Sequence, residues 1–500
     1  MNIQQQLIQT YDTANVKKLL QKLCSKDPTK SWWKLNNKWD LPIPLQSVVM
    51  SLPKGIVQDL VYILLAKSRE LSNSKDFRKS ILLLENTEKE AKESPGISSN
   101  TLYKLNRLID WEILLVQINQ YLEEYPENSI DPGQLISSCK SCLAALQSGD
   151  SVIPRLEVME NCALALLNLG EWDTLTSMDK RWIYLELAAA IAYACQDINK
   201  YKGNKKISRD AWDLILPIFG PNTQNKRSNT GSTASPTSSN LTKNCLVNFL
   251  IRLRESTCLA VVISLLARLH NVLKDEPNLE ITCQYMLLWP AVVSNANSYS
   301  SRSVAEVLIQ VTLQALKFMP TQYPFLKVLG DINYVNNDWA SALRYYLEAG
   351  AVASDYFTQP VPKTAVDDFV YKRMIKCCSQ LQCHTQAAVL CQFLDDVDYT
   401  TAFKCLSETK SSHCVDAMDA YYPCIWDLTI LEYLINLHNK RGETQRKQQV
   451  IKIIGLLELN SNNNEEIQRE AANIRRGQFL RALTNQYSIL SNLNSFFVRN

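Results

Sequence analysis

Residues 323–357 read YPFLKVLGDINYVNNDWASALRYYLEAGAVASDYF. On both sides of the tetrad NNDW at 336–339, apolar residues recur three and four positions apart, which is the spacing of one face of a helix. Asn and Asp favour the backbone conformations of tight turns. The stretch therefore predicts two helices joined by a short turn.

This hairpin is similar to the tetratricopeptide repeat, a helix pair of about 34 residues. Leu326, Asn333 and Ser354 stand where that pattern prefers Trp, Tyr and Pro. The other key positions agree: a small residue allows close approach in the first helix, an aromatic residue follows the turn, and small or aromatic residues pack along the second helix. The residues predicted to pack the repeat are Leu329, Gly330, Trp339, Ala342, Tyr346 and Ala349.

The same helical periodicity runs through most of the chain, for example in GIVQDLVYILLAKSREL at 55–71 and VAEVLIQVTLQALKF at 304–318. Weaker copies of the hairpin place Ser68 and Ser80 at the small positions, repeat the aromatic residue after the turn at Trp172, and recur at 371–394. One hairpin cannot bury its apolar face alone. The sequence therefore predicts an all-α fold of helical hairpins stacked into a superhelical solenoid with a concave binding groove.

Composition predicts four segments along the chain. Residues 1–219 form an N-terminal helical-repeat region, and residues 220–244, rich in Ser, Thr and Asn, form a disordered loop. A second helical-repeat region covers 245–458 and contains the hairpin at 323–357, and residues 459–500 form a C-terminal helix and tail.

Charge and composition argue against several classes of function. Lys and Arg total 53 against 50 Asp and Glu, and the basic residues form no single long stripe, so direct nucleic-acid binding is not expected. Only 13 of 500 residues are Gly, well below the usual share of about 7%, and neither GxGxxG nor GxxxxGK[ST] occurs. The N-terminus lacks the apolar stretch of a signal peptide, and no window holds about 18 consecutive apolar residues. The sequence thus predicts no nucleotide-dependent enzyme, no membrane association, and residence in the cytosol or nucleus.

Fifteen cysteines lie mostly within apolar helical patterns, which is typical of reduced, buried thiols. The chain has four histidines, and none stands in a catalytic motif. Adjacent cysteines on a helix point about 100° apart and ligate one ion poorly, and the CKSC motif at 139–142 has no second pair nearby. We therefore predict no catalytic, cofactor-binding or metal-binding residues. A zinc-dependent enzyme remains an alternative, and its densest candidate cluster is Cys377, Cys378, Cys383 and His384.

Four long stretches resemble a known family. They are WDLPIPLQSVVMSLPKGIVQDLVYILLAKSRELSNSKDF at 39–77, FLKVLGDINYVNNDWASALRYYLEAGAVASDYFTQPVP at 325–362, KRMIKCCSQLQCHTQAAVLCQFL at 372–394 and YYPCIWDLTILEYLINLHNKRGE at 421–443. Their pattern is similar to the C-terminal region of the Integrator complex subunit 8 family. The resemblance covers most of the chain outside 220–244 and the last dozen residues.

This resemblance implies a non-catalytic scaffold subunit of the nuclear Integrator complex. That complex acts on RNA polymerase II transcripts, including the 3′ ends of small nuclear RNAs, and the family helps attach protein phosphatase 2A. The implied partners are other Integrator subunits, protein phosphatase 2A and, indirectly, RNA polymerase II. Family members are about twice as long, and their N-terminal part carries a Trp-Phe-Glu-Phe-like motif linked to phosphatase docking. No Trp-Phe pair occurs here, so the chain is expected to correspond to the C-terminal half only, as a fragment or a split gene model, and direct phosphatase binding is left in doubt.

The segment 425–443 predicts an amphipathic helix whose apolar positions face a core and which Gly442 ends. The predicted core positions are Ile425, Leu428, Leu431, Ile435 and Leu437. Aromatic residues and arginine are favoured in interface hot spots, so Trp426, Tyr433 and Arg441 are candidate partner-binding residues.

A second hypothesis is a general tetratricopeptide adaptor that binds peptide segments of a chaperone or another assembly. Such an adaptor needs Lys or Arg side chains gathered on the first helices of adjacent hairpins. The sequence shows only scattered basic residues, so this hypothesis ranks behind the scaffold.

Overall fold

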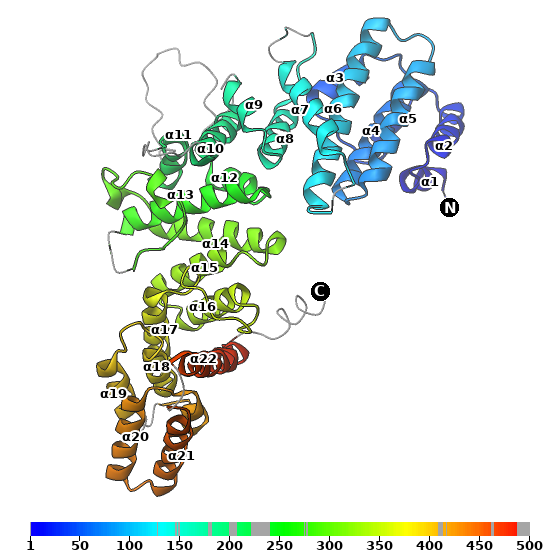
Figure 1. Cartoon of the computed structure of the whole chain (residues 1–500). Coiled ribbons are helices and arrows are strands. Elements are labelled where there is room, and N and C mark those ends of the chain that lie inside the picture. Colours follow the sequence, from blue (N-terminus) through cyan, green and yellow to red (C-terminus); the bar gives the residue numbers. More distant parts are fainter. Residues whose placement is uncertain are drawn as a thin grey trace. The chain divides into compact units, whose positions relative to one another are not determined.

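The structure is a computed structural model that describes residues 2–127, 129–145, 148, 151–178, 183–199, 208–221, 241–274, 276, 279–408, 414–416, 418–461 and 465–487. Every regular element among these residues is a helix, which confirms the predicted all-α fold of stacked helical hairpins (Figure 1). Most of the predicted loop at 220–244 and the tail after Tyr487 lie outside the described residues.

The described chain divides into two compact units. The first unit comprises the described residues of 1–204 and 228–261, and the second comprises those of 205–227 and 262–500, so that the boundary falls within helix α13. The sequence-based division into four segments stays a prediction.

The first unit packs its helices mainly against sequence neighbours. In the hairpin of α4 and α5, the hydroxyl oxygens of Ser68 and Ser80 lie 2.9 Å apart, and both side chains are buried. These are the two small positions predicted for a weaker repeat, and their size lets the two helices approach closely. The elements of this unit are α1 (Ile3–Gln9), α2 (Thr13–Lys26), η1 (Trp32–Leu35), α3 (Ile43–Met50), α4 (Ile56–Asn73), α5 (Phe77–Glu93), α6 (Ser99–Glu123), α7 (Pro132–Ala144), α8 (Leu156–Asn168), α9 (Trp172–Ser177), α10 (Ile183–Asn199), α12 (Lys243–Leu250) and the start of α13 (Ser256–Lys274).

The second unit consists of consecutive helices, and one apolar core runs through its elements from α16 to α22. Its last helix, α22, returns to pack against α16 although the two are far apart in sequence (Figure 1). Besides the end of α13, the elements are α11 (Asp210–Ile215), η2 (Leu216–Phe219), η5 (Met286–Leu288), η6 (Ala296–Ser298), α14 (Ser301–Phe318), α15 (Tyr323–Val335), α16 (Trp339–Ala353), α17 (Asp368–Gln380), α18 (His384–Cys391), α19 (Tyr399–Glu408), η7 (Met418–Cys424), α20 (Leu428–Arg441), α21 (Thr444–Ser461) and α22 (Glu465–Tyr487).

Four helical hairpins have the same type of turn, which indicates that they are copies of one structural repeat. Each joins its helices through three residues, and the middle residue is left-handed, with φ between 61° and 75°: Lys75, Gly170, Asn337 and Gln382. The residue after it donates its amide to a carbonyl five positions earlier, which is the Schellman closure of a helix end. These bonds are Asp76 N to Leu71 O, Glu171 N to Leu166 O, Asp338 N to Asn333 O and Cys383 N to Cys378 O, each 2.9 Å long.

Helix α13 is long and apolar enough to cross a membrane by length and composition alone, with a mean hydropathy of 1.6. However, 72% of that window is buried inside the protein, as is typical of the core helix of a folded unit.

Candidate functional site

The hairpin of α15 and α16 is the best-formed repeat of the second unit. Helix α16 begins where the Asp338 carboxylate accepts the Ser341 amide at 3.2 Å, which satisfies one of the free N–H groups at the helix start. The Trp339 ring meets the ring of Tyr334 edge-on, with the centroids 5.4 Å apart. The aromatic residue after the turn thus packs back onto the first helix.

The structure places the other predicted packing residues in the interior. Leu329, Gly330, Ala342, Tyr346 and Ala349 are all buried, and the Tyr346 ring lies directly against the backbone of Gly330. Trp339 remains half-buried at the start of α16. Whether these residues also serve partner binding stays a prediction.

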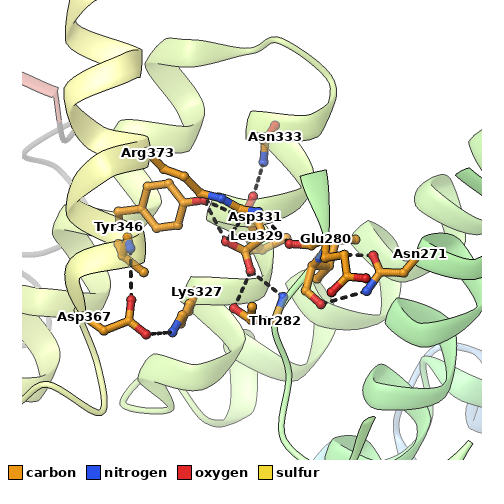
Figure 2. Close-up of polar contacts among 12 residues, drawn as sticks. Asn271, Glu280, Thr282, Lys327, Leu329, Asp331, Asn333, Tyr346, Asp367 and Arg373 are labelled. Atoms are coloured by element: carbon orange, nitrogen blue, oxygen red, sulfur yellow. Dashed lines mark hydrogen bonds and ion pairs between the residues drawn. The ribbon is translucent and has the colours of Figure 1, made fainter. Parts of the chain in front are cut away.

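Sequence reasoning missed the polar centre of this hairpin. Asp331, on α15, is completely buried, and its Oδ1 accepts the Tyr346 hydroxyl at 2.7 Å. The same oxygen lies 2.5 Å from Nη1 of Arg373, on α17 (Figure 2). The other oxygen, Oδ2, accepts both the amide and the hydroxyl of Thr282, at 2.8 and 2.9 Å. One carboxylate therefore joins α15, α16, α17 and the segment before η5.

Arg373 completes this cluster because its Nη2 donates to the Glu280 carbonyl at 2.6 Å. Its guanidinium also lies over the rings of Phe369 and Tyr334, 4.2 and 4.9 Å from their centroids. Burial lowers the pKa of Arg373, but the charge of Asp331 together with Tyr346 outweighs that effect and raises it. Burial, aided by Asp331, raises the pKa of Tyr346 well above its ordinary value. Arg373 thus stays charged, and the tyrosine stays a neutral donor.

Comparisons with known proteins agree with this geometry. A family model described as "INTS8, TPR repeats" matches residues 1–487. The chain belongs to this family. It is 36% identical to a mouse protein named Integrator complex subunit 8 over 497 residues, which is 97% of this chain and 48% of that protein. The human protein of the same name is also 36% identical over 97% of this chain and 48% of its own length.

A protein of Dictyostelium discoideum named Integrator complex subunit 8-like protein is 27% identical over 170 residues, 33% of this chain and 83% of that protein. The chain spans about half the length of the mouse and human members of the Integrator complex subunit 8 family that it matches.

The three candidate partner-binding residues of this family member already have contacts within the chain. The Tyr433 ring stacks on Phe403, with centroids 4.2 Å apart, and Arg441 donates from Nη2 to the Ser407 carbonyl at 2.8 Å. The Trp426 ring packs on Phe393 at 5.1 Å. Each side chain is only half-buried, so part of it remains exposed on this chain. A partner-binding role stays a proposal.

The structure corrects one residue of the predicted amphipathic helix. Leu428 is 47% exposed and does not face the core, because it is the first residue of α20, directly after its N-cap Asp427. The fully buried positions of α20 are instead Ile430, Leu431, Leu434 and His438. Ile425 is buried, Ile435 and Leu437 are half-buried against the core, and Gly442 ends the helix with φ 70° as predicted.

The cysteine-rich segment of α17 and α18 is apolar core. All fifteen cysteines are free thiols, and Cys377, Cys378 and Cys383 are buried. Burial raises the pKa of Cys377 to about 12, so that its metal-binding thiolate form is disfavoured. Among the described residues, no group of three or more His, Cys, Asp or Glu is placed to hold a metal ion. His413 lies outside the described residues.

His270, on α13, gives a pH-dependent prediction. Burial, aided by the nearby Lys274, lowers its pKa from 6.5 to about 4, and its Nδ1 has no hydrogen-bond partner. Below about pH 6.5 this histidine therefore binds a proton in the unfolded chain, whereas in the native state it stays neutral down to about pH 4. The free energy of unfolding thus falls as the pH drops from 6.5 toward 4. Between pH 7 and pH 5, His270 alone costs about 2 kcal/mol of unfolding free energy.

The variant His270→Gln should lose about 2 kcal/mol less than the unmodified chain over this pH interval. Urea unfolding followed by circular dichroism at both pH values measures the difference. Equal losses in the two proteins would contradict the assignment of a neutral, buried His270.

Proposed function

We propose that the chain is a non-catalytic scaffold subunit of an Integrator complex in the nucleus. The observation that carries the proposal is the match at 36% identity along 97% of the chain to proteins named Integrator complex subunit 8. Stacked helical hairpins support it, because such arrays present extended surfaces to several partners at once.

Within that assembly, the proposed role is to support cleavage and termination of RNA polymerase II transcripts, the processing of small nuclear RNA 3′ ends and the attachment of protein phosphatase 2A. The proposed direct partners are other Integrator subunits, and the polymerase is reached through them. Phosphatase attachment is proposed at the level of the complex. The chain spans only about half the length of its longer relatives, so direct contact between this chain and the phosphatase has to be measured separately.

Affinity purification tests the proposal. The chain, tagged and expressed in cultured cells, is purified from nuclear extract at moderate salt, and the co-purifying proteins are identified by mass spectrometry. Recovery of Integrator subunits together with phosphatase supports both the scaffold role and phosphatase attachment. Recovery of Integrator subunits alone supports the scaffold role and places phosphatase docking elsewhere. Recovery of chaperones without Integrator subunits would overturn the proposal in favour of the general adaptor.

The same purification tests the candidate anchors on α20. The double variant Tyr433→Leu and Arg441→Ala should recover about fivefold less of the Integrator subunits, because each removed side chain is typical of interface hot spots. The matched control is Arg302→Ala on α14, whose side chain is 91% exposed. Full recovery with the double variant would remove Tyr433 and Arg441 from the interface and leave the scaffold role intact.

A further inference from the structure

A groove of about 480 Å³ lies between α17, the start of α18 and α19. This volume falls within the range of about 300–1,000 Å³ that is usual for ligand sites. Ile375 and Cys405, both nearly buried, contribute the apolar part of its lining. The polar part includes Lys372, Lys376, Ser379, His384 and Lys404.

Three lysines make the groove basic. Lys372 and Lys376 are four residues apart on α17 and so share one face of the helix, while Lys404 comes from α19. All three side chains are exposed, and none makes an ion pair with a described residue. Nearby lysines differ in this respect, because Lys363 binds Asp395 at 2.5 Å and Lys327 binds Asp367 at 3.6 Å.

The acidic residues of the groove are already engaged. Asp398 accepts the Thr401 amide at 3.0 Å and so caps the start of α19. Glu408 Oε2 lies 3.6 Å from Nδ1 of His384. Three lysines that make no ion pair with the described residues thus face two carboxylates, so the lining carries a net positive charge.

His384 adds a polar side chain to the wall of the groove. Its side chain lines the groove although the residue is only 5% exposed, and its Nε2 lies 3.2 Å from Gln382 Oε1. Its Nδ1 makes no hydrogen bond with a described residue, but the Glu408 carboxylate lies 3.6 Å from it.

We propose that this groove binds an extended acidic segment of a partner protein. Glutamate or aspartate side chains of that segment pair with Lys372, Lys376 and Lys404, and Ser379 and Thr401 lie beside the path of its backbone. A single-stranded nucleic acid fits less well, because the described residues that line the groove include no Phe, Tyr or Trp on which its bases could stack.

The test is direct binding to the purified full chain. The probe is a fluorescein-labelled peptide of about ten residues in which glutamates alternate with serines, measured by fluorescence anisotropy at low and moderate salt. The groove variant is Lys372→Glu with Lys376→Glu, which keeps helix propensity because Lys and Glu are similar in this respect. The matched control is Lys18→Glu with Lys22→Glu on α2, two exposed lysines with the same spacing.

The groove variant should weaken binding of the peptide about tenfold or more, and the control should change it less than about twofold. A photo-crosslinker in the peptide should label residues of 372–408. Equal weakening by the two variants would overturn the proposal, because it would show charge attraction without a site. Equal or tighter binding of an oligouridylate of the same charge would overturn it in favour of a nucleic-acid groove. The measurement uses the isolated chain, so it stands or falls independently of Integrator membership.

Discussion

Replacing Asp331 with alanine is expected to lower the free energy of unfolding of the second unit by about 3–5 kcal/mol. The carboxylate is fully buried, and three side chains direct donors at it: Arg373, Tyr346 and Thr282. Alanine would leave the Arg373 guanidinium, which is 3% exposed, without its counter-charge. The loss is therefore dominated by a buried, unpaired cation and only partly by the hydrogen bonds themselves.

The matched control for this variant is Asp338→Ala in the same hairpin. Asp338 is exposed and caps α16 with one hydrogen bond of 3.2 Å, so its loss should cost only about 1 kcal/mol. Urea unfolding of the three proteins, followed by circular dichroism, gives both values. Similar costs for Asp331→Ala and Asp338→Ala would contradict the central role of the Asp331 cluster.

A double variant separates the charge from the hydrogen bonds. Combining Asp331→Ala with Arg373→Met removes both charges and keeps an apolar side chain of similar length in place of the arginine. The double variant should be more stable than Asp331→Ala alone, because the stranded cation is gone. An additive loss from the two substitutions would show that Arg373 and Asp331 do not act as a pair.

The hairpin at 323–357 could be predicted from the sequence because its cues are local. The Asn-Asn-Asp turn, the small Gly330 and the aromatic Trp339 all lie within ten positions of one another, and the structure shows the matching left-handed Asn337 and the contact of Gly330 with Tyr346. The weaker copies were also recognisable, because Ser68 and Ser80 occupy small positions of the same spacing. Such residues recur at the spacing of a helix, so their pattern is visible in the sequence.

The features that could not be predicted join residues that are distant in the chain. Asp331 and Arg373 are 42 positions apart, and nothing in VLGDINYV or YKRMIK says which charge each residue meets. Only the stacking of α17 on α16 brings the two together. Likewise, Lys404 joins Lys372 and Lys376 in one groove only because the fold brings α19 to the same groove as α17. The one signal of the cluster in the sequence was Asp331, an acidic residue within an otherwise apolar helix, where a charge needs a partner.

Replacing Gly330 with alanine is expected to destabilise the second unit by about 3 kcal/mol, although alanine is the better helix former. The new Cβ would lie 2.5 and 2.6 Å from Cε1 and Cδ1 of Tyr346, closer than carbon atoms approach in folded proteins. The ring cannot move aside easily, because Tyr346 is 1% exposed and its hydroxyl is held by Asp331 at 2.7 Å. The strain must therefore be relieved by moving α15 and α16 apart, which disrupts their shared core.

Gly455→Ala on α21 is the matched control for this substitution, because no atom lies within 4 Å of the position that its Cβ would occupy. There the same change should stabilise the chain by about 0.5–1 kcal/mol through helix propensity alone. Adding Tyr346→Leu to Gly330→Ala should cost less than the sum of the two single substitutions, since the smaller side chain vacates the space that the methyl group needs. Urea unfolding of the single and double variants measures this coupling. Strict additivity would mean that Gly330 is small for a reason other than the approach of Tyr346.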